Sequence, residues 1–253
     1  MTTRNAVLLF MYNQTTEQLS LTQETYASLI AQDIDGGIDL YIVNNGSTAP
    51  TVEWIGSLSP PENVKIKCFH FPVNESPVLL YNRLLGIIFD ENKHPFVLCI
   101  PNDVIAPPNL YSEMVKFPAG LISAALTEDR NFPRDMTATG VHDRANLAVC
   151  LLRKWAYDGL VARFGSFYDT RYFCYASDCD IRFRFSACGI VGRQLDILCY
   201  HYGSGSWRLA PPFEAYRMTR GADEDRARFF EKWGFTIGSP EYEALAVDPN
   251  FRG

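Results

Sequence analysis

Short apolar runs alternate with longer amphipathic segments through the first half of the chain. The runs at residues 6–11, 38–43, 64–69 and 96–100 are typical of strands. Residues 15–32 and 77–91 have the apolar spacing of helices, and Ser76-Pro77 suits the start of the second one. Strands that alternate with helices favour parallel pairing and right-handed crossovers. The pattern therefore predicts an α/β fold, with a mainly parallel sheet flanked by helices.

The second half of the chain is less regular, and its tail is helical in pattern. Residues 181–188 predict a short helix closed by Gly189. Further strands are expected at residues 120–126, 146–152 and 190–200, and the tail from Pro211 is expected to pack through Phe229, Phe230 and Trp233. Because no repeat or clear linker interrupts this pattern, we expect one domain over residues 1–206. A mostly helical extension, residues 207–253, is expected to pack on it.

Polar residues gather where three of the predicted strands end. They are Tyr12-Asn13-Gln14, Asn44-Asn45-Gly46-Ser47-Thr48 and Pro101-Asn102-Asp103. In an open parallel sheet the ligand crevice lies beyond the carboxyl ends of the strands. Asn-Gly and Asn-Asp are also ordinary turn sequences, so each segment alone is compatible with a plain loop. The agreement of three segments predicts one polar crevice at this edge of the sheet.

Composition and charge narrow the classes of function. Apolar residues make up 47% of the 253 residues and charged residues 21%, which is typical of a soluble globular protein with a sizeable core. A net charge of 23 − 29 = −6 without a basic cluster argues against nucleic-acid binding, although not against small phosphorylated ligands. No apolar run approaches the ~18 residues that span a membrane. The seven cysteines form no C-x-x-C pair, so free, buried thiols in a cytoplasmic protein are expected rather than a zinc cluster.

Six segments, in order along residues 6–206, resemble the motifs of a known family. They are Tyr12-Asn13; Ile42-Val-Asn-Asn-Gly-Ser47; Asn74 with Tyr81-Asn82-Arg83 and Gly86; Leu98-Cys-Ile-Pro-Asn-Asp103; Phe164-Gly-Ser-Phe-Tyr-Asp169 with Tyr175-Ala-Ser-Asp-Cys-Asp180, Arg184 and Gly189; and His201 with Gly203 and Ser206. They are similar to the motifs of family 2 nucleotide-sugar glycosyltransferases, which have the GT-A fold. The resemblance implies a GT-A-like domain that transfers a sugar from a UDP-, GDP- or dTDP-sugar. The acceptor would be the hydroxyl of a saccharide, a protein or another compound.

The resemblance also implies a divalent metal, Mn²⁺ or Mg²⁺, as cofactor. The leaving diphosphate gains charge as the glycosidic bond breaks, and a bound cation stabilises that charge. Asp103 would supply a carboxylate ligand and His201 an imidazole, which Mn²⁺ accepts. The motif keeps a single carboxylate, because Asn102 stands at its first position. The alternatives are a turn or helix cap for Asp103 and a surface or core histidine for His201.

The resemblance makes Asp178 the general base that takes the proton of the acceptor hydroxyl, most simply in an inverting displacement. Retaining enzymes share the fold, and no residue excludes that outcome. Asp180 would lie either in an extended segment or in the first turn of a helix, where the helix dipole favours a carboxylate. Arg184 would either pair with Asp180 or order the preceding loop.

The remaining site predictions concern the nucleotide. Tyr12 offers a flat ring on which a base can stack, and Arg83 is either a bidentate donor to the diphosphate or a solvated helix residue. Trp207 and the loop of residues 127–144 are candidates for the acceptor side. The full set of residues predicted to bind the nucleotide is Tyr12, Asn13, Asn44, Asn45, Asn82, Arg83 and Asn102.

Two other functions fit an α/β sheet of this kind. A sugar nucleotidylyltransferase would have a Gly-rich basic loop after the first strand, where this chain has Tyr12-Asn-Gln14. A non-catalytic module that binds nucleotides or carbohydrates would have no need of both Asp103 and Asp178.

Overall fold

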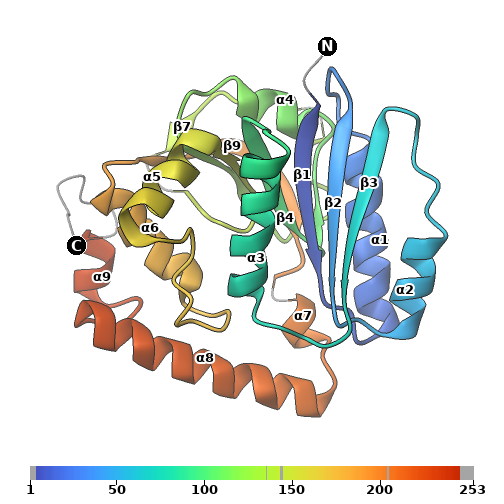
Figure 1. Ribbon diagram of the computed structural model, residues 1–253. Helices are drawn as coiled ribbons and strands as arrows, with labels where there is room; N and C mark the ends of the chain where they lie inside the picture. The colour runs from blue at the N-terminus through green and yellow to red at the C-terminus, as the bar shows by residue number, and fades with distance from the viewer. Residues whose placement is uncertain (1–3, 135, 143–144, 204, 246–253) are drawn as a thin grey trace.

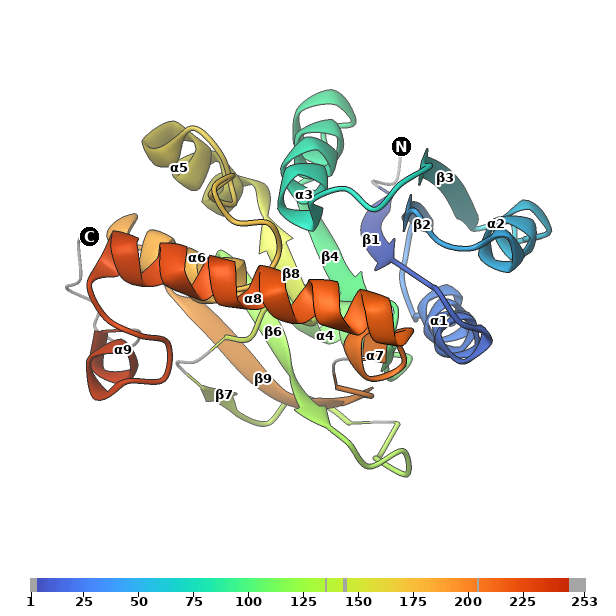
Figure 2. The ribbon, with the colours of Figure 1, turned by 90° about the horizontal axis from the view of Figure 1, so that it is seen from below.

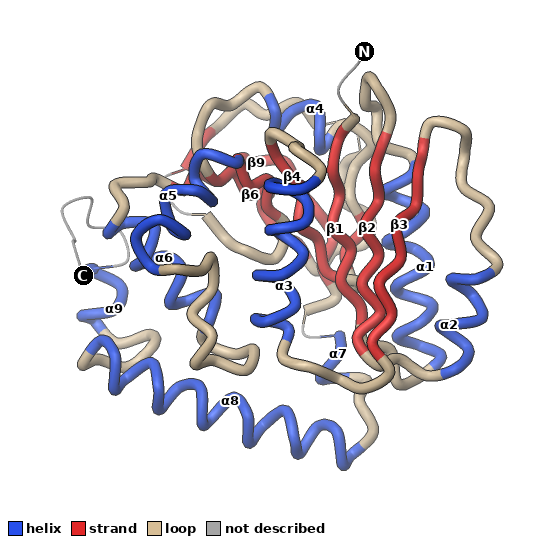
Figure 3. Tube along the Cα trace, viewed as in Figure 1, coloured by secondary structure: helices blue, strands red, loops and turns tan. Residues whose placement is uncertain are grey.

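In a computed structural model, the described residues are 4–134, 136–142, 145–203 and 205–245. Within them, nine strands form one sheet in the order β3-β2-β1-β4-β8-β6-β9-β5, with β7 paired to β9. The strands are β1 (Asn5–Met11), β2 (Ile38–Asn45), β3 (Val64–Phe71), β4 (Phe96–Pro101), β5 (Val104–Ile105), β6 (Leu121–Thr127), β7 (Val141–His142), β8 (Cys150–Arg153) and β9 (Gly192–His201). Figures 1 and 3 show helices on both sides of this sheet.

The helices include all those that the sequence predicts and several more. They are α1 (Thr16–Ile30), α2 (Ala49–Gly56), α3 (Pro77–Gly86) with the π-helical turn η1 (Ile87–Glu91), α4 (Leu110–Val115), α5 (Lys154–Phe164), α6 (Ser177–Ala187), α7 (Gly205–Arg208), α8 (Pro212–Trp233) and α9 (Pro240–Leu245). The predicted cap of α3 forms, since the Ser76 hydroxyl accepts from the Leu79 N–H, and Thr15 and Gln18 make a capping box at α1.

The half of the sheet that comes first in the sequence is wholly parallel. β1 lies between β2 and β4, β3 pairs with β2, and all three pairings are parallel. The carboxyl ends of these four strands therefore meet at one edge, the lower edge in Figure 1. The other half is mixed: β8 is antiparallel to β4 and β6, whereas β6 and β9 are parallel. This confirms the predicted α/β fold with a mainly parallel sheet.

Side chains of β1 alternate between two buried layers. Val7, Leu9 and Met11 pack in a cluster with α1, α2 and α4, while Ala6 and Leu8 pack with α3, α5 and α6 on the opposite face. Each fully buried aliphatic side chain of this kind stabilises the fold by about 1.5–3 kcal/mol. A strand that is apolar on both faces explains why β1 appears in the sequence as a continuous run.

A third cluster attaches the C-terminal helices to the sheet domain. α8 runs beneath α6, and its N-terminal end lies near α7, toward the edge where the parallel strands end (Figures 1 and 2). Phe229 of α8 is fully buried against Phe183 of α6 and Tyr242 of α9, and Trp233 packs on the same ring of Phe183. The prediction that Phe230 packs together with Phe229 and Trp233 is wrong. Phe230 is 53% exposed, because it points away from the side of α8 that carries the other two side chains.

One predicted strand is shorter than its apolar pattern. β8 begins at Cys150 rather than at residue 146, because the Asn146 side chain accepts from the N–H groups of Ala148 and Val149 and forms a turn there. All seven cysteines are free thiols, but the prediction that they are buried holds only for Cys99, Cys150 and Cys199, and Cys68 is exposed on the edge strand β3. None of the helices in the described ranges is long and apolar enough to cross a membrane.

Candidate functional site

A cavity of about 750 Å³ lies at the edge where the parallel strands end. Residues at the ends of β1, β2 and β4 form one wall, and Phe173, Cys174 and Tyr175, from the loop before α6, form another. Trp207 of α7 and the exposed charged face of α8 complete it. A cavity of this size and mixed chemistry is typical of sites for small organic ligands.

Three of the predicted nucleotide-binding residues, Tyr12, Asn45 and Asn102, line this cavity. The Tyr12 hydroxyl donates to the Glu214 carboxylate of α8, at 2.8 Å. Burial and this carboxylate raise the pKa of Tyr12 to about 12, so the phenol stays protonated at neutral pH. Its ring is available as one wall of the cavity, while its hydroxyl connects β1 to α8.

Asn45 shapes the cavity through the loop that precedes α3. Its side-chain amide donates to Asn74 Oδ1 at 2.8 Å and to the Glu75 carbonyl at 3.0 Å, and its Oδ1 accepts from the Glu75 N–H at 2.9 Å. The adjacent Gly46 has φ +77°, and a Cβ there would lie 2.5 Å from the Asn74 nitrogen. Only glycine permits this close approach, so the turn after β2 and the loop after β3 form one rigid unit.

Asn13 and Asn44 lie behind the cavity wall. Asn13 Oδ1 accepts from Asn102 Nδ2 at 2.7 Å and from the Thr22 hydroxyl at 3.0 Å, which orients Asn102 toward the cavity. Asn13 Nδ2 is buried without a hydrogen-bond partner. Asn44 Oδ1 accepts from the Ser47 N–H at 3.1 Å and holds the turn after β2. These two residues therefore act on the site through their neighbours.

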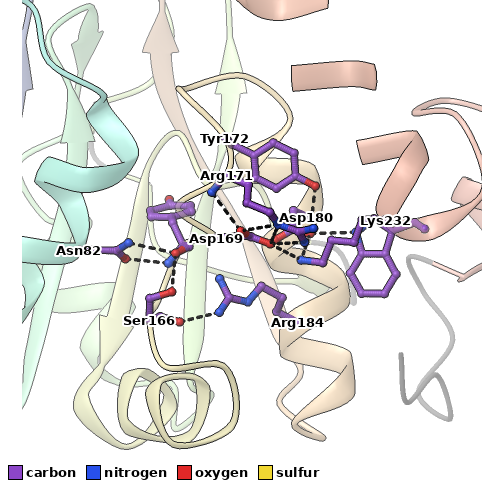
Figure 4. A network of polar contacts seen from close by, with 10 residues as sticks. Asn82, Ser166, Asp169, Arg171, Tyr172, Asp180, Arg184 and Lys232 are labelled. Atoms are coloured by element: carbon purple, nitrogen blue, oxygen red, sulfur yellow. Dashed lines mark hydrogen bonds and ion pairs between the residues drawn. The ribbon is translucent and has the colours of Figure 1, made fainter. Parts of the chain in front are cut away.

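Asn82 and Arg83 of α3 are not in the described wall of the cavity. The Asn82 side chain makes two hydrogen bonds to the backbone of Tyr168, at 2.9 Å to its carbonyl and 2.7 Å from its N–H (Figure 4). It therefore fixes the loop between α5 and α6 from the side of α3. Arg83 is exposed, so the structure places it as a solvated helix residue.

Asp103 and His201 lie side by side. β5 begins at the residue after Asp103 and pairs antiparallel with β9, which brings His201 Nε2 to 3.4 Å from Asp103 Oδ1. The other carboxylate oxygen, Oδ2, accepts from the Gly205 N–H at 2.9 Å. Both side chains are largely buried, with exposed fractions of 8% for Asp103 and 22% for His201.

This pair fits two ligands of one divalent cation. A carboxylate oxygen and an imidazole nitrogen 3.4 Å apart can both reach an ion between them. In the described part of the chain no group of three or more His, Cys, Asp or Glu side chains could hold a metal. The remaining ligands would therefore come from substrate phosphates and water, which is how Mg²⁺ is usually bound at phosphate sites.

Asp178 lies in the first turn of α6 and is exposed. Its Oδ1 accepts from the Cys179 N–H at 2.9 Å. The described wall of the cavity includes Cys174 and Tyr175, just before the helix, but not Asp178. Between them, Ala176 has φ +61°, a left-handed conformation that is costly for a residue with a Cβ. The chain thus turns sharply between the cavity wall and the predicted base.

Asp180 lies in the first turn of α6, the second of the two placements that the sequence left open, and it serves as a structural anchor there. It is buried and accepts from Lys232 Nζ at 2.6 Å and Trp233 Nε1 at 2.8 Å, both on α8 (Figure 4). Lys232 also donates to Asp169 at 2.8 Å. Burial tends to raise the pKa of Asp169, but hydrogen bonds from Arg171 and Lys232 outweigh it, so the pKa lies below the ordinary value.

Arg184 orders the loop between α5 and α6. Its Nη2 donates to the Ser166 carbonyl at 2.6 Å, and its guanidinium lies 4.5 Å from the centre of the Phe164 ring (Figure 4). Burial lowers the pKa of Arg184. Of the two roles that the sequence left open, the described contacts favour loop ordering, since Asp180 pairs with Lys232 instead.

Several residues of the site were missed in the sequence, and most of them lie on α8. Asp225 is fully buried and accepts from the Phe173 and Cys174 N–H groups at 2.9 Å each, so α8 fixes the loop that lines the cavity. The cavity wall also includes α8 side chains of both charges, Arg217, Arg220, Glu224 and Arg228. In the sequence these look like an ordinary solvated helix face, and nothing marks which of them is buried.

No family model matches the sequence, and no curated protein does. Solved structures match its fold. The mannosyltransferase PcManGT from Pyrobaculum calidifontis, in complex with GDP-Man and Mn²⁺, aligns with 100% of this chain and 70% of its own, with TM-score 0.61 and 14% identity. S. aureus TarS residues 1–349, with UDP, align with 95% of this chain and 77% of that chain (TM-score 0.55, 14% identity). The chain therefore shares the fold of these proteins.

Proposed function

We propose that the chain is a nucleotide-sugar glycosyltransferase related to family 2, which transfers a sugar from a nucleoside diphosphate to an acceptor hydroxyl with the help of a divalent cation. The observation that carries this proposal is the convergence of three strand ends on one cavity, next in sequence to a carboxylate–imidazole pair. Tyr12, Asn45 and Asn102 line a single cavity, and the residue after Asn102 pairs with His201. The fold shared with a mannosyltransferase solved with GDP-Man and Mn²⁺ supports it.

Each residue has a chemical task in this proposal. The Tyr12 ring stacks on the base, and Asn45 and Asn102, whose side-chain amides are held by their protein neighbours, shape the cavity wall beside the nucleoside. Asp103 and His201 would hold Mn²⁺ or Mg²⁺, which as a Lewis acid supplies charge stabilisation for the leaving diphosphate. The carboxylate of Asp178 accepts the proton of the acceptor hydroxyl as that hydroxyl attacks the anomeric carbon. The displacement then inverts the configuration at that carbon.

A thermal-shift panel tests the binding step. UDP, GDP and dTDP and their sugars are each added with and without Mn²⁺ to the wild-type protein and to Asp103→Asn. A ligand at 100 times its dissociation constant adds about 2.7 kcal/mol of stability, which corresponds to a rise in Tm of roughly 5–10 °C for a chain of this size. The expected result is a metal-dependent rise in the wild type and a much smaller one in the variant. No metal-dependent rise with any nucleotide would contradict the proposal.

The exposed position of Asp178 favours one alternative, a module that binds nucleotide sugars without transferring them. Asp178→Asn separates the two. If Asp178 is the base, the variant binds the donor as the wild type does and loses transfer by about 10²–10⁴-fold. Equal turnover in the variant would remove Asp178 from the mechanism. Analysis of the product's anomeric configuration then distinguishes an inverting from a retaining reaction.

A further inference from the structure

The cationic side chains that line the cavity come from α8 and not from α3. Arg217, Arg220 and Arg228 are all in its wall, together with Glu224. Their spacing along the helix, three, seven and eleven residues after Arg217, places all four on one face. Arg83, the arginine that the sequence suggested for the diphosphate, is outside the described wall. The guanidinium groups nearest to a bound ligand are therefore those of α8.

Two of these arginines, Arg217 and Arg220, pair with glutamates of α8 in the part of the chain that the structure describes. Arg217 lies 3.3 Å from Glu214 and Arg220 lies 3.2 Å from Glu224, with exposed side-chain fractions of 46% and 72%. Exposed ion pairs of this kind contribute little to stability, so a ligand can replace them at small cost. Arg228 differs, because it also pairs with the fully buried Asp225 at 2.7 Å.

We propose that Arg217 and Arg220 form a phosphate subsite on α8, which binds a phosphate group of the molecule that fills the cavity. This inference rests on the proposed function and extends it to residues outside the family motifs. A phosphate has several acceptor oxygens and up to two negative charges, so it can engage two guanidinium groups through paired N–H donors. The aromatic walls, Tyr12, Tyr175 and Trp207, suit the ring-bearing remainder of such a molecule.

The phosphate can belong to the donor or to the acceptor. Arg217 and Tyr12 both contact Glu214. Arg217 therefore lies on the side of the cavity where the nucleobase is expected to stack on Tyr12. Glu224 sits between Arg220 and Arg228, at 3.2 and 3.5 Å, and competes with any anion for both. Replacing either arginine should therefore weaken the binding of an anionic probe, whereas neutralising Glu224 should strengthen the binding of the same probe.

Binding is measured by calorimetry with three probes: UDP with Mn²⁺, inorganic pyrophosphate, and glucose 6-phosphate added to the UDP-saturated protein. Arg217→Gln and Arg220→Gln are each expected to weaken at least one probe about tenfold, because each removes a charge-assisted hydrogen bond. Glu224→Gln is expected to strengthen the same probe by about two- to fivefold. Arg226→Gln is the matched control, since Arg226 pairs with Asp223 at 3.0 Å on the same helix but is not in the described cavity wall.

The pattern of probes identifies the source of the phosphate. Weaker UDP and pyrophosphate binding assigns the subsite to the donor, whereas weaker glucose 6-phosphate binding alone assigns it to the acceptor. If wild type binds UDP but Arg217→Gln and Arg220→Gln bind all three probes as Arg226→Gln does, the subsite is refuted and the proposed function stands. A wild-type protein that binds none of the probes overturns the subsite, and it overturns the proposed function as well if GDP and dTDP with Mn²⁺ also fail to bind.

Discussion

The two ends of α8 attach to the rest of the protein in opposite ways. Its C-terminal half is held by buried groups: Asp225 binds the loop before α6, Lys232 joins two carboxylates, and Phe229 is enclosed by aromatic rings. Its N-terminal end contacts the strand ends through the hydrogen bond from Tyr12 to Glu214, and Phe213 there is 70% exposed. The C-terminal half of α8 therefore stabilises the fold, whereas the N-terminal end leaves charged and aromatic side chains available to a ligand.

The largest expected effect on stability is at the buried end. Asp225→Ala removes the acceptor of two backbone N–H groups and a partner of Arg228, and it leaves the Phe173 and Cys174 N–H groups without that acceptor. Removing one member of a buried, hydrogen-bonded charge cluster costs about 3–5 kcal/mol. Urea unfolding of the wild type and the variant measures this loss. Asp223→Ala, a change of the same kind at an exposed site of α8, is the control and should cost less than about 0.5 kcal/mol.

Equal losses in Asp225→Ala and Asp223→Ala would contradict the distinction between the two ends of α8. A loss of nucleotide binding in Asp225→Ala is also expected, because the loop that it fixes lines the cavity. That loss should exceed what the lower stability alone explains at a temperature where both proteins are folded.

Acid should weaken the same buried end of the helix. The pKa of Asp169 in the folded protein lies below its ordinary value of 3.8, so the unfolded chain takes up the proton first as pH falls. The stability that Asp169 contributes is therefore complete above about pH 4 and is lost progressively below it. Asp169→Asn removes this contribution, so the difference in stability between wild type and variant should shrink as pH falls from 5 to about 2.

Chemical denaturation at a series of pH values measures that difference. Lys232→Met tests the cause, since without the lysine the carboxylate loses one of the two hydrogen-bond partners that lower its pKa. A difference between wild type and Asp169→Asn that does not change with pH would contradict the assignment.

The sequence predicted the strand-end part of the site far better than the α8 part, and the physical reason differs between them. The ends of β1, β2 and β4 follow from apolar runs, because parallel strands bring their carboxyl ends to one edge. In contrast, Asp223 and Asp225 of α8 are both acidic residues in a charged helix, yet only Asp225 is buried. Which one is buried depends on the loop packed against α8, and that tertiary contact leaves no local pattern in the sequence.

The missed helices have a similar cause. α5 carries an exposed Trp155 among buried Ala156, Tyr157 and Leu160, so its apolar spacing is imperfect. The end of α5 does have a local signal in the sequence, namely the glycine at position 165. In the structure Gly165 adopts φ +76°, the conformation of a helix-terminating glycine. The pairing of Asp103 with His201 depended on motif resemblance, since the residues between them form several elements and local spacing predicts no contact.

The smallest expected effect is at the other end of α8. Tyr12→Phe removes the hydrogen bond to Glu214, which keeps Arg217 as a partner at 3.3 Å. The free energy of unfolding should therefore fall by only about 0.5–1.5 kcal/mol. Hydrogen exchange should accelerate at the backbone amides of residues 216–219, beyond the first turn of α8, while those of residues 225–233 keep their wild-type rates.

Nucleotide binding separates the ring of Tyr12 from its hydroxyl. Tyr12→Phe retains the face on which a base can stack, so its affinity for UDP with Mn²⁺ should stay within about twofold of wild type, whereas Tyr12→Ala should weaken it about tenfold or more. Equal acceleration of exchange along the whole of α8 in Tyr12→Phe would mean that the two ends open together. The helix would then act as one rigid element, and its N-terminal end could not respond to a ligand independently of the buried anchor at Asp225.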